Sequence, residues 1–580
     1  MSVIGTAAAV TAATKTIDPE LDWPVARLRV DDLRVAFLVA GARRGVVRGL
    51  SFELAPGECV AIVGESGSGK SVTARALVGL AGRNAIVEAS TLELHHEDVR
   101  AFTARQWRQV RGRDVGFILQ DALVSLDPLR TVGAEIAEAL RLHRWGTRAR
   151  RARRVIELLT RVGVPRPALR ARQRPDQLSG GLRQRALIAS AIALDPDIVI
   201  ADEPTTALDV TVQVQVLAEL ETMKRRGASI ILISHDLSVV AQLADQILVM
   251  RAGEVVEQGS AATVLGAPTH EYTRALIAAV PSEHTRGTPL SPVPVPDAAL
   301  SASAPAPADS RTGPVLEARD LTKHFGAPDG SITRAVDGVS FALDAGKTLG
   351  IVGESGSGKS TTARLVLGLE TLDRGTVRLL GRDWSGIPER RRRPLRPRIS
   401  VVSQDPLSSF DPRWNVERIL VDALAASDRR GASAKRARAV ELLGFVGLGA
   451  EVLDRFPLRL SGGQRQRVAI ARALATRPSV IVLDEAVSAL DVTVQAQILD
   501  LLVALQRSSG VSYLFISHDL GVISHLSDEV LVMKDGAVVE SGAPDEIFRR
   551  PRHPYTRELI ASIPEFDPAA IATSAASTRK

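Results

Sequence analysis

The chain has 580 residues and a net charge of +7, with 45% apolar and 24% charged residues. This length suggests two to four domains of an ordinary globular protein, and basic residues interspersed with acidic ones argue against a specific nucleic-acid partner. The single cysteine, Cys59, excludes an intrachain disulfide, a four-cysteine zinc site and a four-cysteine iron–sulfur cluster, and no run of about 20 apolar residues predicts a membrane-spanning helix.

The two ends of the chain are predicted to be disordered. Residues 1–24 are rich in alanine and threonine and lack the basic start and long apolar run of a signal peptide. Residues 566–580 form a second short tail of small and polar residues.

Most of the remaining chain consists of two copies of one unit, which we place at residues 25–280 and 315–565. A glycine-rich segment at 64–71 recurs at 353–360, and a Leu-Ser-Gly-Gly segment at 178–181 recurs at 460–463. An Asp-Glu pair at 202–203 recurs at 484–485, and a Ser-His-Asp segment at 234–236 recurs at 517–519. These segments keep their order and nearly their spacing, so duplication of a whole domain explains them better than a short solenoid repeat.

Residues 281–314, between the copies, are rich in proline, alanine and serine. Such a composition predicts a partly extended linker that buries no core. The linker is long enough for either copy to reach the other.

Each copy has the pattern of an α/β domain. Continuous apolar, β-branched runs at 198–201, 230–233, 480–483 and 513–516 predict strands that are buried on both faces. Helical patterns lie between these runs, which favours a mostly parallel sheet flanked by helices.

The glycine-rich segments have the Gly-x-x-x-x-Gly-Lys-Ser pattern of a phosphate-binding loop, in which backbone N–H groups surround phosphate oxygens. An apolar strand is predicted before each loop and a helix after it, so the positive helix end adds to the site. Lys70 and Lys359 are expected to contact the β- and γ-phosphates of ATP, and Ser71 and Ser360 to ligate Mg²⁺. A chance glycine-rich turn is the alternative, but two matching copies argue against it. The predicted ATP-binding residues here are Gly64, Glu65, Ser66, Gly67, Ser68, Gly69, Lys70 and Ser71, and Gly353, Glu354, Ser355, Gly356, Ser357, Gly358, Lys359 and Ser360.

An Asp-Glu pair follows an apolar strand in each copy. Asp202 and Asp484 are placed to hold Mg²⁺ through its water shell. Glu203 and Glu485 are placed to orient or deprotonate an attacking water. One such pair alone would be no more than two solvated acids, but both pairs follow a phosphate loop at similar spacing.

The Leu-Ser-Gly-Gly segments precede basic, helix-like runs. A serine hydroxyl and glycine N–H groups at a helix start form a second anion site. Taken alone, the segment is weak, because an ordinary serine-capped helix has the same pattern. The residues concerned are Ser179, Gly180 and Gly181, and Ser461, Gly462 and Gly463.

In this order, the motifs resemble the ATPase domain of the ABC (ATP-binding cassette) family. The set also contains Gln120 and Gln404 as Q-loop glutamines, the D-loops at 207–209 and 489–491, and the switch histidines His235 and His518. The resemblance implies two P-loop NTPase (ABC ATPase) domains of the α/β class. Each would have a mostly parallel sheet core, an antiparallel β subdomain and a helical subdomain.

The resemblance further implies a head-to-tail pair of domains with two ATP molecules between them. Lys70 would share one ATP with Ser461 and Gly463, and Lys359 the other with Ser179 and Gly181. Gln120 and Gln404 would contact ATP and Mg²⁺, and His235 and His518 the γ-phosphate. Phe37 and Phe325 resemble the aromatic residue that stacks on adenine, although a strand core position explains them equally well. Covalent fusion favours pairing within one chain, at an effective concentration of about a millimolar, and a swapped dimer of chains stays open.

Further segments resemble the peptide-importer branch of the family, which includes nickel and glutathione importers. They are the segments at 120–128 and 404–412, and the endings at 268–273 and 551–556. The implied partners are two integral membrane permease subunits and an extracytoplasmic solute-binding protein, with this chain peripheral on the cytoplasmic face of the membrane. Leu182 replaces the usual glutamine, and Ala486 and Val487 the usual Pro-Thr pair, so we expect two competent but unequal sites.

Two other classes of protein share parts of this pattern. Soluble tandem ABC proteins act on ribosomes or DNA, but their linkers tend to be long, charged and helical. A nucleotide sensor without turnover would not need Glu203 and Glu485. The sequence leaves the cargo open among dipeptides, longer peptides, glutathione-like compounds and nickel complexes.

Overall fold

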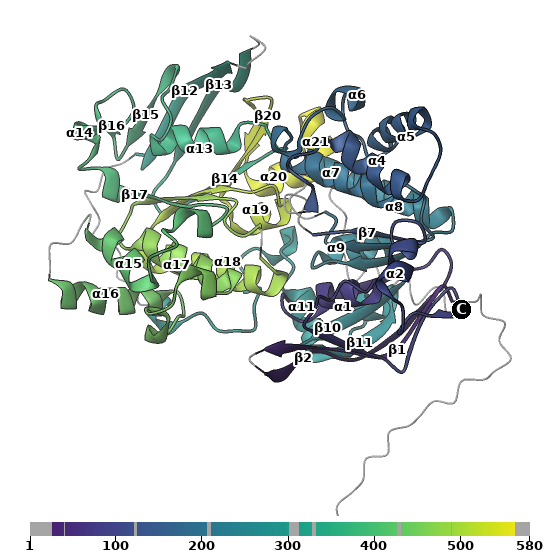
Figure 1. Cartoon of the computed structure of the whole chain (residues 1–580). Helices are drawn as coiled ribbons and strands as arrows, with labels where there is room; N and C mark the ends of the chain where they lie inside the picture. The colour runs from purple at the N-terminus through teal and green to yellow at the C-terminus, as the bar shows by residue number, and fades with distance from the viewer. Residues whose placement is uncertain are drawn as a thin grey trace, which may run out of the picture.

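The computed structural model describes residues 26–39, 41–120, 125–205, 210–300, 313–326, 332–425, 431–488 and 490–562. The predicted tails at 1–24 and 566–580 lie outside these ranges, as do residues 121–124 of the first importer-like segment and the whole D-loop at 207–209. Two halves of the same architecture lie side by side, the first coloured from purple to teal and the second from teal-green to yellow (Figure 1).

Each half is built around a six-stranded sheet whose central strands are parallel. These strands are β3 (Cys59–Val63), β7 (Val115–Ile118), β8 (Ile198–Asp202), β9 (Ser229–Ile233), β10 (Gln246–Arg251) and β11 (Glu254–Ser260), then β14 (Thr348–Val352), β17 (Ile399–Val402), β18 (Val480–Asp484), β19 (Ser512–Ile516), β20 (Glu529–Lys534) and β21 (Ala537–Gly542). The order is β11-β10-β3-β9-β8-β7 in the first half and its equivalent, β21-β20-β14-β19-β18-β17, in the second. Only β11 and β21 run antiparallel to their neighbours. Every residue of β3, β9, β14 and β19 is buried, as expected for strands covered on both faces.

An antiparallel sheet adjoins each central sheet. Its strands are β1 (Leu28–Val39), β2 (Ala42–Leu54), β4 (Ala85–Glu88), β5 (Thr91–Leu94) and β6 (Glu97–Asp98), and in the second half β12 (Leu316–Gly326), β13 (Ile332–Leu343), β15 (Arg374–Leu379) and β16 (Arg382–Asp383). Buried and exposed residues alternate along β1 and β13, so one face meets the core and the other meets solvent. The predicted α/β class, with a mostly parallel core and an antiparallel subdomain in each half, is confirmed.

Helices cover the central sheets and form a further layer at the outer edge of each half. In the first half they are α1 (Lys70–Leu77), α2 (Ala104–Val110), α4 (Val132–Leu142), α5 (Arg148–Arg161), α6 (Pro167–Arg170), α7 (Gly180–Ala191), α8 (Val210–Arg225), α9 (Leu237–Leu243), α10 (Ala261–Gly266) and α11 (Glu271–Ala278). In the second half they are α13 (Lys359–Leu367), α14 (Glu389–Arg392), α15 (Val416–Ala425), α16 (Ala432–Phe445), α17 (Gly462–Leu474), α18 (Val492–Ser509), α19 (Leu520–Leu526), α20 (Pro544–Arg549) and α21 (Pro554–Ala561). The predicted helical subdomains are α4, α5 and α7, and α15, α16 and α17, which pack on one another.

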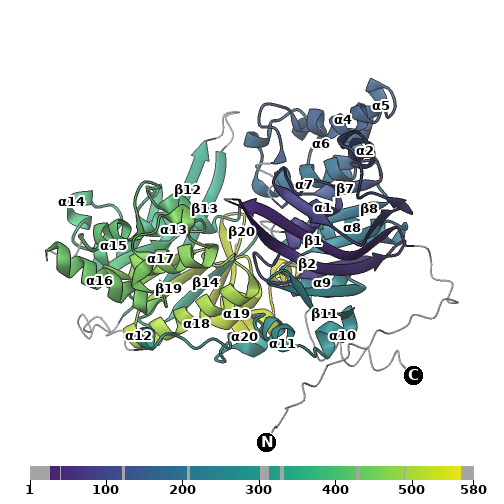
Figure 2. The same ribbon diagram turned by 60° about the horizontal axis from the view of Figure 1, so that its bottom comes forward.

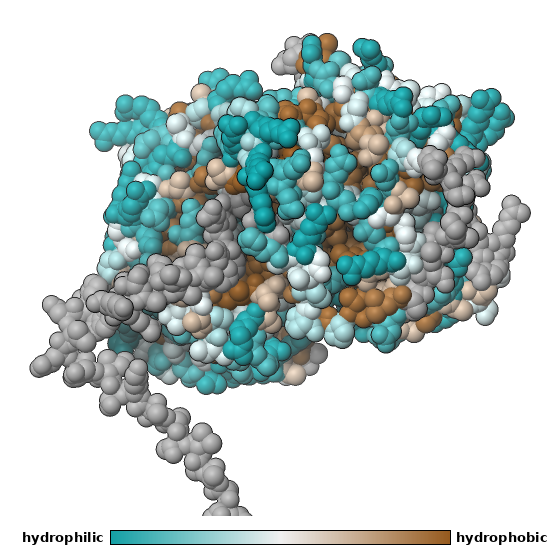
Figure 3. Space-filling view, turned by 180° about the vertical axis from the view of Figure 1, so that it is seen from behind, coloured by the Kyte–Doolittle hydropathy of each residue, from teal (hydrophilic) through white to brown (hydrophobic). Residues whose placement is uncertain are grey.

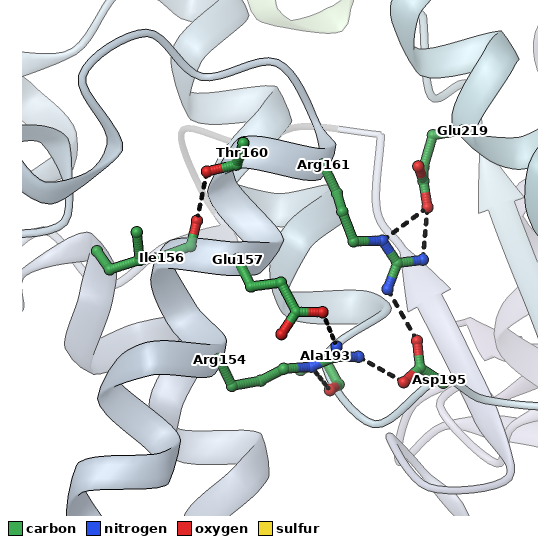
Figure 4. A network of polar contacts seen from close by, with 8 residues as sticks. All are labelled: Arg154, Ile156, Glu157, Thr160, Arg161, Ala193, Asp195 and Glu219. Atoms are coloured by element: carbon green, nitrogen blue, oxygen red, sulfur yellow. Dashed lines mark hydrogen bonds and ion pairs between the residues drawn. The ribbon is translucent and has the colours of Figure 1, made fainter.

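A network of ion pairs fixes the first helical subdomain to the helix that flanks the central sheet (Figure 4). Arg161 of α5 donates to Glu219 of α8 at 2.6 Å and to Asp195, beyond α7, at 2.9 Å. Arg154, two turns earlier on α5, also pairs with Asp195. Because Arg161 and Glu219 are largely buried, solvent and salt screen their attraction less than that of a solvent-exposed pair.

The two halves are in contact across their facing sides. Helix α11 of the first half lies beside α18 of the second, as Figures 1 and 2 show from two directions. One hydrophobic cluster contains buried residues of both halves, among them Leu276 of α11 and Ile498 of α18.

None of the helices in the described ranges combines the length and the apolar character that crossing a bilayer requires. The face opposite to that of Figure 1 carries hydrophilic side chains over much of its area, with apolar residues in smaller groups (Figure 3).

The linker between the halves packs on the second half through residues 281–300. It contains a 3-10 turn (Glu283–Thr285) and α12 (Asp297–Leu300), which contacts α16 and α18. Leu290 and Ala299 are 2% and 0% exposed and belong to the cluster that spans both halves. The prediction that this composition buries no core is therefore wrong for these residues; residues 301–312 lie outside the described ranges.

A buried carboxylate explains how a proline-rich segment packs here. Asp500 of α18 is 8% exposed and accepts hydrogen bonds from the N–H groups of Leu290 at 3.0 Å and Ser291 at 2.9 Å. These bonds satisfy backbone donors that would otherwise be buried without a partner.

Asp500→Ala should release the linker from the second half. Loss of an acceptor for two backbone N–H groups is expected to weaken the contact by about 1–3 kcal/mol. Limited trypsinolysis should then cleave after Arg286 at least fivefold faster than in the wild type. Asp383→Ala, which removes a carboxylate that is 77% exposed, is the control and should cleave at the wild-type rate. Equal rates for Asp500→Ala and wild type would contradict the assigned contact.

Candidate functional site

The glycine-rich loop of each half connects a buried central strand to the helix that follows it. In the first half, β3 ends at Val63 and α1 begins at Lys70. Gly64 has a φ of 144°, and a Cβ there would lie 2.1 Å from the Met250 carbonyl oxygen. Gly353 repeats this geometry, with a φ of 149° and a Cβ position 2.2 Å from the Met533 oxygen. Only glycine fits these positions, so the first glycine of the motif is required by the fold itself.

The lysine of each loop is turned back onto the loop's own carbonyl groups. Lys70 Nζ donates to the carbonyl oxygens of Gly64 at 2.7 Å and Glu65 at 2.8 Å. Lys359 makes the equivalent bonds to Gly353 and Glu354, both at 2.7 Å. Burial lowers the pKa of Lys70, and the nearby carboxylates of Glu203 and Asp491 oppose this shift.

An aspartate and a serine meet beside each loop. Ser71 Oγ donates to Asp202 Oδ1 at 2.9 Å, and Ser360 Oγ donates to Asp484 Oδ1 at 3.1 Å. Asp202 is completely buried, and its second oxygen, Oδ2, has no hydrogen-bond partner. Burial raises the pKa of Asp202 and of Asp484, and the serine hydrogen bonds oppose this effect.

These residues fit a hydrated Mg²⁺ ion. Serine and carboxylate oxygens are hard ligands, and an unpaired buried carboxylate oxygen is stabilised by a cation or its water shell. In the described part of the chain, no group of three or more His, Cys, Asp or Glu residues could hold a metal ion. A divalent cation here would therefore rely on Ser71, Asp202 and the phosphates of a nucleotide.

A glutamate, a glutamine and a histidine converge at the end of the same strand. Gln120 Nε2 donates to Glu203 Oε2 at 2.8 Å, and His235 Nδ1 lies 3.3 Å from Glu203 Oε1. Glu203 has a φ of 52°, a left-handed conformation that is strained for a residue with a side chain. This conformation directs the residue after β8 toward the Q-loop and switch positions.

The second half repeats the arrangement with Gln404, Glu485 and His518. Gln404 Nε2 donates to Glu485 Oε2 at 2.6 Å, His518 Nδ1 lies 3.5 Å from Glu485 Oε1, and the φ of Glu485 is 50°. Burial alone would lower the pKa of His518, but its hydrogen bond to Glu485 and the charge of that residue outweigh burial, so the pKa is raised. Burial would raise the pKa of Glu485, but the hydrogen bond and charge of His518 outweigh burial, so this pKa is lowered.

A contact between the halves reaches the first glycine-rich loop. The Ser66 N–H donates to Asp491 Oδ1, in the D-loop of the second half, at 2.8 Å. Asp491 also contributes to the electrostatic surroundings of Lys70 and His235. The reciprocal D-loop at 207–209 lies outside the described residues.

The Leu-Ser-Gly-Gly segments lie at helix starts, as predicted. Ser179 precedes α7 and Ser461 precedes α17, and both serines are exposed together with the glycine that follows each. Sharing of an ATP between Lys70 and Ser461, or between Lys359 and Ser179, stays a prediction.

The two signature helices differ at their first turn. Gln464 and Ser461 form a reciprocal capping box, with two hydrogen bonds of 3.2 Å. Leu182 takes the equivalent position in α7 and has no amide to offer, and the Ser179 side chain makes no capping bond. The substitution at Leu182 therefore changes the local structure, while Ala486 and Val487 are buried in the core.

The two predicted adenine-stacking residues lie on the antiparallel sheets. Phe37 on β1 is half-buried and packs against the core of the first half. Phe325 on β12 is 41% exposed, with the Lys323 ammonium 5.4 Å from its ring centre. The stacking role of both stays a prediction.

Two tyrosines at the loops were missed from the sequence. Tyr272 OH accepts from the Glu65 N–H, and Tyr555 OH accepts from the Glu354 N–H, both at 3.1 Å. The signal that identifies them is the His-x-Tyr-Thr segment that ends both copies.

Comparison with known proteins agrees with the duplicated site. The ABC transporter model matches residues 47–206 and 336–488, and the model of the oligopeptide/dipeptide transporter C-terminal region matches residues 256–301 and 539–579. The oligopeptide transport ATP-binding protein OppD of Mycobacterium tuberculosis (strain ATCC 25618 / H37Rv) is 42% identical, covering 93% of this chain and 99% of that protein. The glutathione import ATP-binding protein GsiA of Escherichia coli (strain K12) is also 42% identical, covering 93% of this chain and 90% of that protein.

Among solved structures, a match is the dimeric post-hydrolysis state of an ATP-binding cassette bound to ADP and Pi. It is 28% identical, with a TM-score of 0.37, and covers 40% of this chain and 98% of that chain. The two family matches and the relatives that align along 93% of the sequence lead to one conclusion: the chain belongs to the ABC transporter family, as a tandem ATP-binding and ATP-hydrolysing member with two oligopeptide-type C-terminal regions.

Proposed function

We propose that this chain energises the import of peptides or related small cargo through two separate membrane permease subunits. The observation that carries the proposal is the Gln–Glu–His constellation beside a phosphate loop, present in both halves with the same contacts. An extracytoplasmic solute-binding protein would deliver the cargo, and the chain would lie peripherally on the cytoplasmic face of the membrane. The names of the relatives, for oligopeptide transport and glutathione import, support this class of cargo.

The loops would hold the triphosphate of ATP. Backbone N–H groups of the glycine-rich loop and the start of α1 would bind phosphate oxygens, and Lys70 would contact the β- and γ-phosphates. Mg²⁺, when bound by Ser71 and Asp202 with Gln120 nearby, would neutralise phosphate charge. Ser360, Asp484 and Gln404 would have these roles in the second half.

Glu203 and Glu485 would activate the attacking water. In the structure each carboxylate is oriented by a glutamine on one oxygen and a histidine on the other. The histidine would contact the γ-phosphate, so the three side chains would respond together to the binding and the loss of ATP. The glutamine lies at the start of the segment that leads to the helical subdomain, where permease contact would be made.

ATP binding would close the halves and hydrolysis would reopen them. The contact from Ser66 to Asp491 supports a paired arrangement in which the D-loop of one half meets the phosphate loop of the other. Since only differential affinity of ATP for the closed state can do work, the signature residues of one half would have to join the phosphate loop of the other on closure. Unequal first turns at α7 and α17 support unequal turnover at the two sites. A soluble ribosome- or DNA-acting ATPase is not favoured, because the relatives are transport proteins.

The double variant Glu203→Gln and Glu485→Gln should slow steady-state ATP hydrolysis by roughly 10²–10⁴-fold, because glutamine cannot accept a proton from water. ATP binding should persist, measured by equilibrium binding of a fluorescent ATP analogue. Glu254→Gln, a surface substitution on β11, is the matched control and should turn over normally. Turnover of the double variant within threefold of wild type would remove both glutamates from this role.

The pairing of Glu485 with His518 predicts a specific pH dependence. The pKa of His518 is raised, so its contribution to stability is present below about pH 6.5 and is lost as the pH rises through the raised value. The pKa of Glu485 is lowered, so its contribution is present above about pH 4.5 and is lost as the pH falls through the lowered value. Both contributions are complete between these limits.

Glu485→Gln should therefore lower the pKa of His518, because burial remains while the charge that opposed it is removed. Titration of the histidine ring signals by NMR measures this shift directly. Glu203→Gln is the internal control and should move His235 while leaving His518 in place. An unchanged or higher pKa of His518 in Glu485→Gln would show that the pair does not interact as described.

A further inference from the structure

The C-terminal region of each half contacts the phosphate loop of the same half through a single hydroxyl group. Tyr272 OH accepts from the Glu65 N–H and Tyr555 OH accepts from the Glu354 N–H, in each case at 3.1 Å. Both tyrosines are buried, at 6% and 3% exposure. The two halves make this contact independently with the same geometry, so it is a regular feature of the fold.

The peptide unit on which the tyrosine acts is the one that holds the loop lysine. The Glu65 N–H and the Gly64 carbonyl belong to the same planar peptide group, and that carbonyl accepts from Lys70 Nζ at 2.7 Å. The peptide between Gly353 and Glu354 is held in the same way by Tyr555 and Lys359. A hydrogen bond to the N–H end polarises the peptide and strengthens its carbonyl as an acceptor.

This peptide unit needs an external restraint on its orientation. Gly64 and Gly353 have positive φ values, and glycine allows more rotation there than any other residue. A hydroxyl fixed at the N–H end selects the orientation in which the carbonyl faces the lysine. With two of its three N–H donors on the loop, the Lys70 ammonium can direct its third toward a phosphate.

Each tyrosine is itself held by the C-terminal region. His270 Nδ1 accepts from the Tyr272 N–H at 3.1 Å and caps α11, while the His270 N–H donates to Glu257 of β11 at 3.2 Å. The Arg251 guanidinium lies 5.1 Å from the centre of the Tyr272 ring. A strand carboxylate, a histidine cap and a cation over the ring therefore fix the hydroxyl.

The second half repeats these supports. His553 Nδ1 accepts from the Tyr555 N–H at 3.2 Å, and the His553 N–H donates to Glu540 of β21 at 3.0 Å. Lys534 Nζ lies 4.5 Å from the centre of the Tyr555 ring. The repeated His-x-Tyr-Thr segment thus has a structural purpose at the nucleotide site.

We propose that Tyr272 and Tyr555 are positioning residues that set the two loop lysines for ATP through the peptide after the first loop glycine. The proposal rests on the proposed function, since it concerns ATP binding by Lys70 and Lys359. In the first half the neighbouring N–H, that of Ser66, is bound by Asp491 of the second half. The C-terminal region of one half and the D-loop of the other therefore restrain consecutive residues of one phosphate loop.

Replacement of both tyrosines by phenylalanine tests the proposal in the full chain. Tyr272→Phe with Tyr555→Phe removes two oxygen atoms and keeps the rings, their burial and their cation contacts. The KM for MgATP should rise about tenfold, as expected for a partly buried N–H that loses its tyrosine acceptor, while kcat changes by less than threefold. Each single variant should give a smaller rise in KM. The single variants therefore test the proposal if the double variant is unstable.

The chain has three tyrosines, and the third supplies the matched control. Tyr513 is buried, and its hydroxyl donates to the Leu502 carbonyl at 3.0 Å, so Tyr513→Phe removes a buried hydroxyl with no link to the loop. It should lower the melting temperature without raising KM. A KM within twofold of wild type in the double variant, or an equal rise in Tyr513→Phe, would overturn the proposal while leaving ATP turnover by the wild type intact. A wild-type chain without ATP turnover would overturn the proposed function, and this inference with it.

Discussion

Pairing of the two halves depends on the hydrogen bond between Ser66 and Asp491. It joins the phosphate loop of one half to the D-loop of the other across 425 positions of sequence. A backbone N–H paired with a carboxylate is a charge-assisted bond and is geometrically demanding. It therefore places the first phosphate loop at the contact between the two halves.

Contacts of α11, α18 and the linker also hold the two halves together. Helix α11 lies beside α18, and the linker after α11 is hydrogen-bonded to Asp500 of α18. The D-loop residue Asp491 immediately precedes α18. One helix of the second half thus carries the contact to the first phosphate loop and the anchor of the linker, so covalent fusion and domain pairing reinforce each other.

Local chemistry made much of the site predictable from sequence. Glycines with positive φ, a lysine at a helix start and acids at strand ends are fixed by short segments, and Gly64, Lys70, Asp202 and Glu203 lie where the motifs predict. The α/β architecture followed from apolar runs with the length of buried strands. The site motifs and the buried strands both depend on interactions between residues that are close in sequence.

The parts that were not predicted depend on contacts between distant segments. Tyr272 lies 207 positions from Glu65, so the His-x-Tyr-Thr segment marks the tyrosine but does not identify its hydrogen-bond partner. Leu290 and Ala299 are buried only because the second half offers Asp500 and an apolar surface, so a composition typical of an extended linker was misleading. Exposure of the signature serines depends on the relative position of the halves, which local patterns do not specify.

Disulfide trapping between Ser66→Cys and Asp491→Cys tests most directly whether the two halves pair within one chain. Cys59 is buried at 0% exposure, so the introduced pair would be the reactive one. Pairing of the two halves within one chain predicts rapid formation of an intrachain disulfide under mild oxidation, seen as a monomer-sized species with altered gel mobility that reverts on reduction. Dimer-sized products, or no cross-link at all, would contradict pairing of the two halves within one chain.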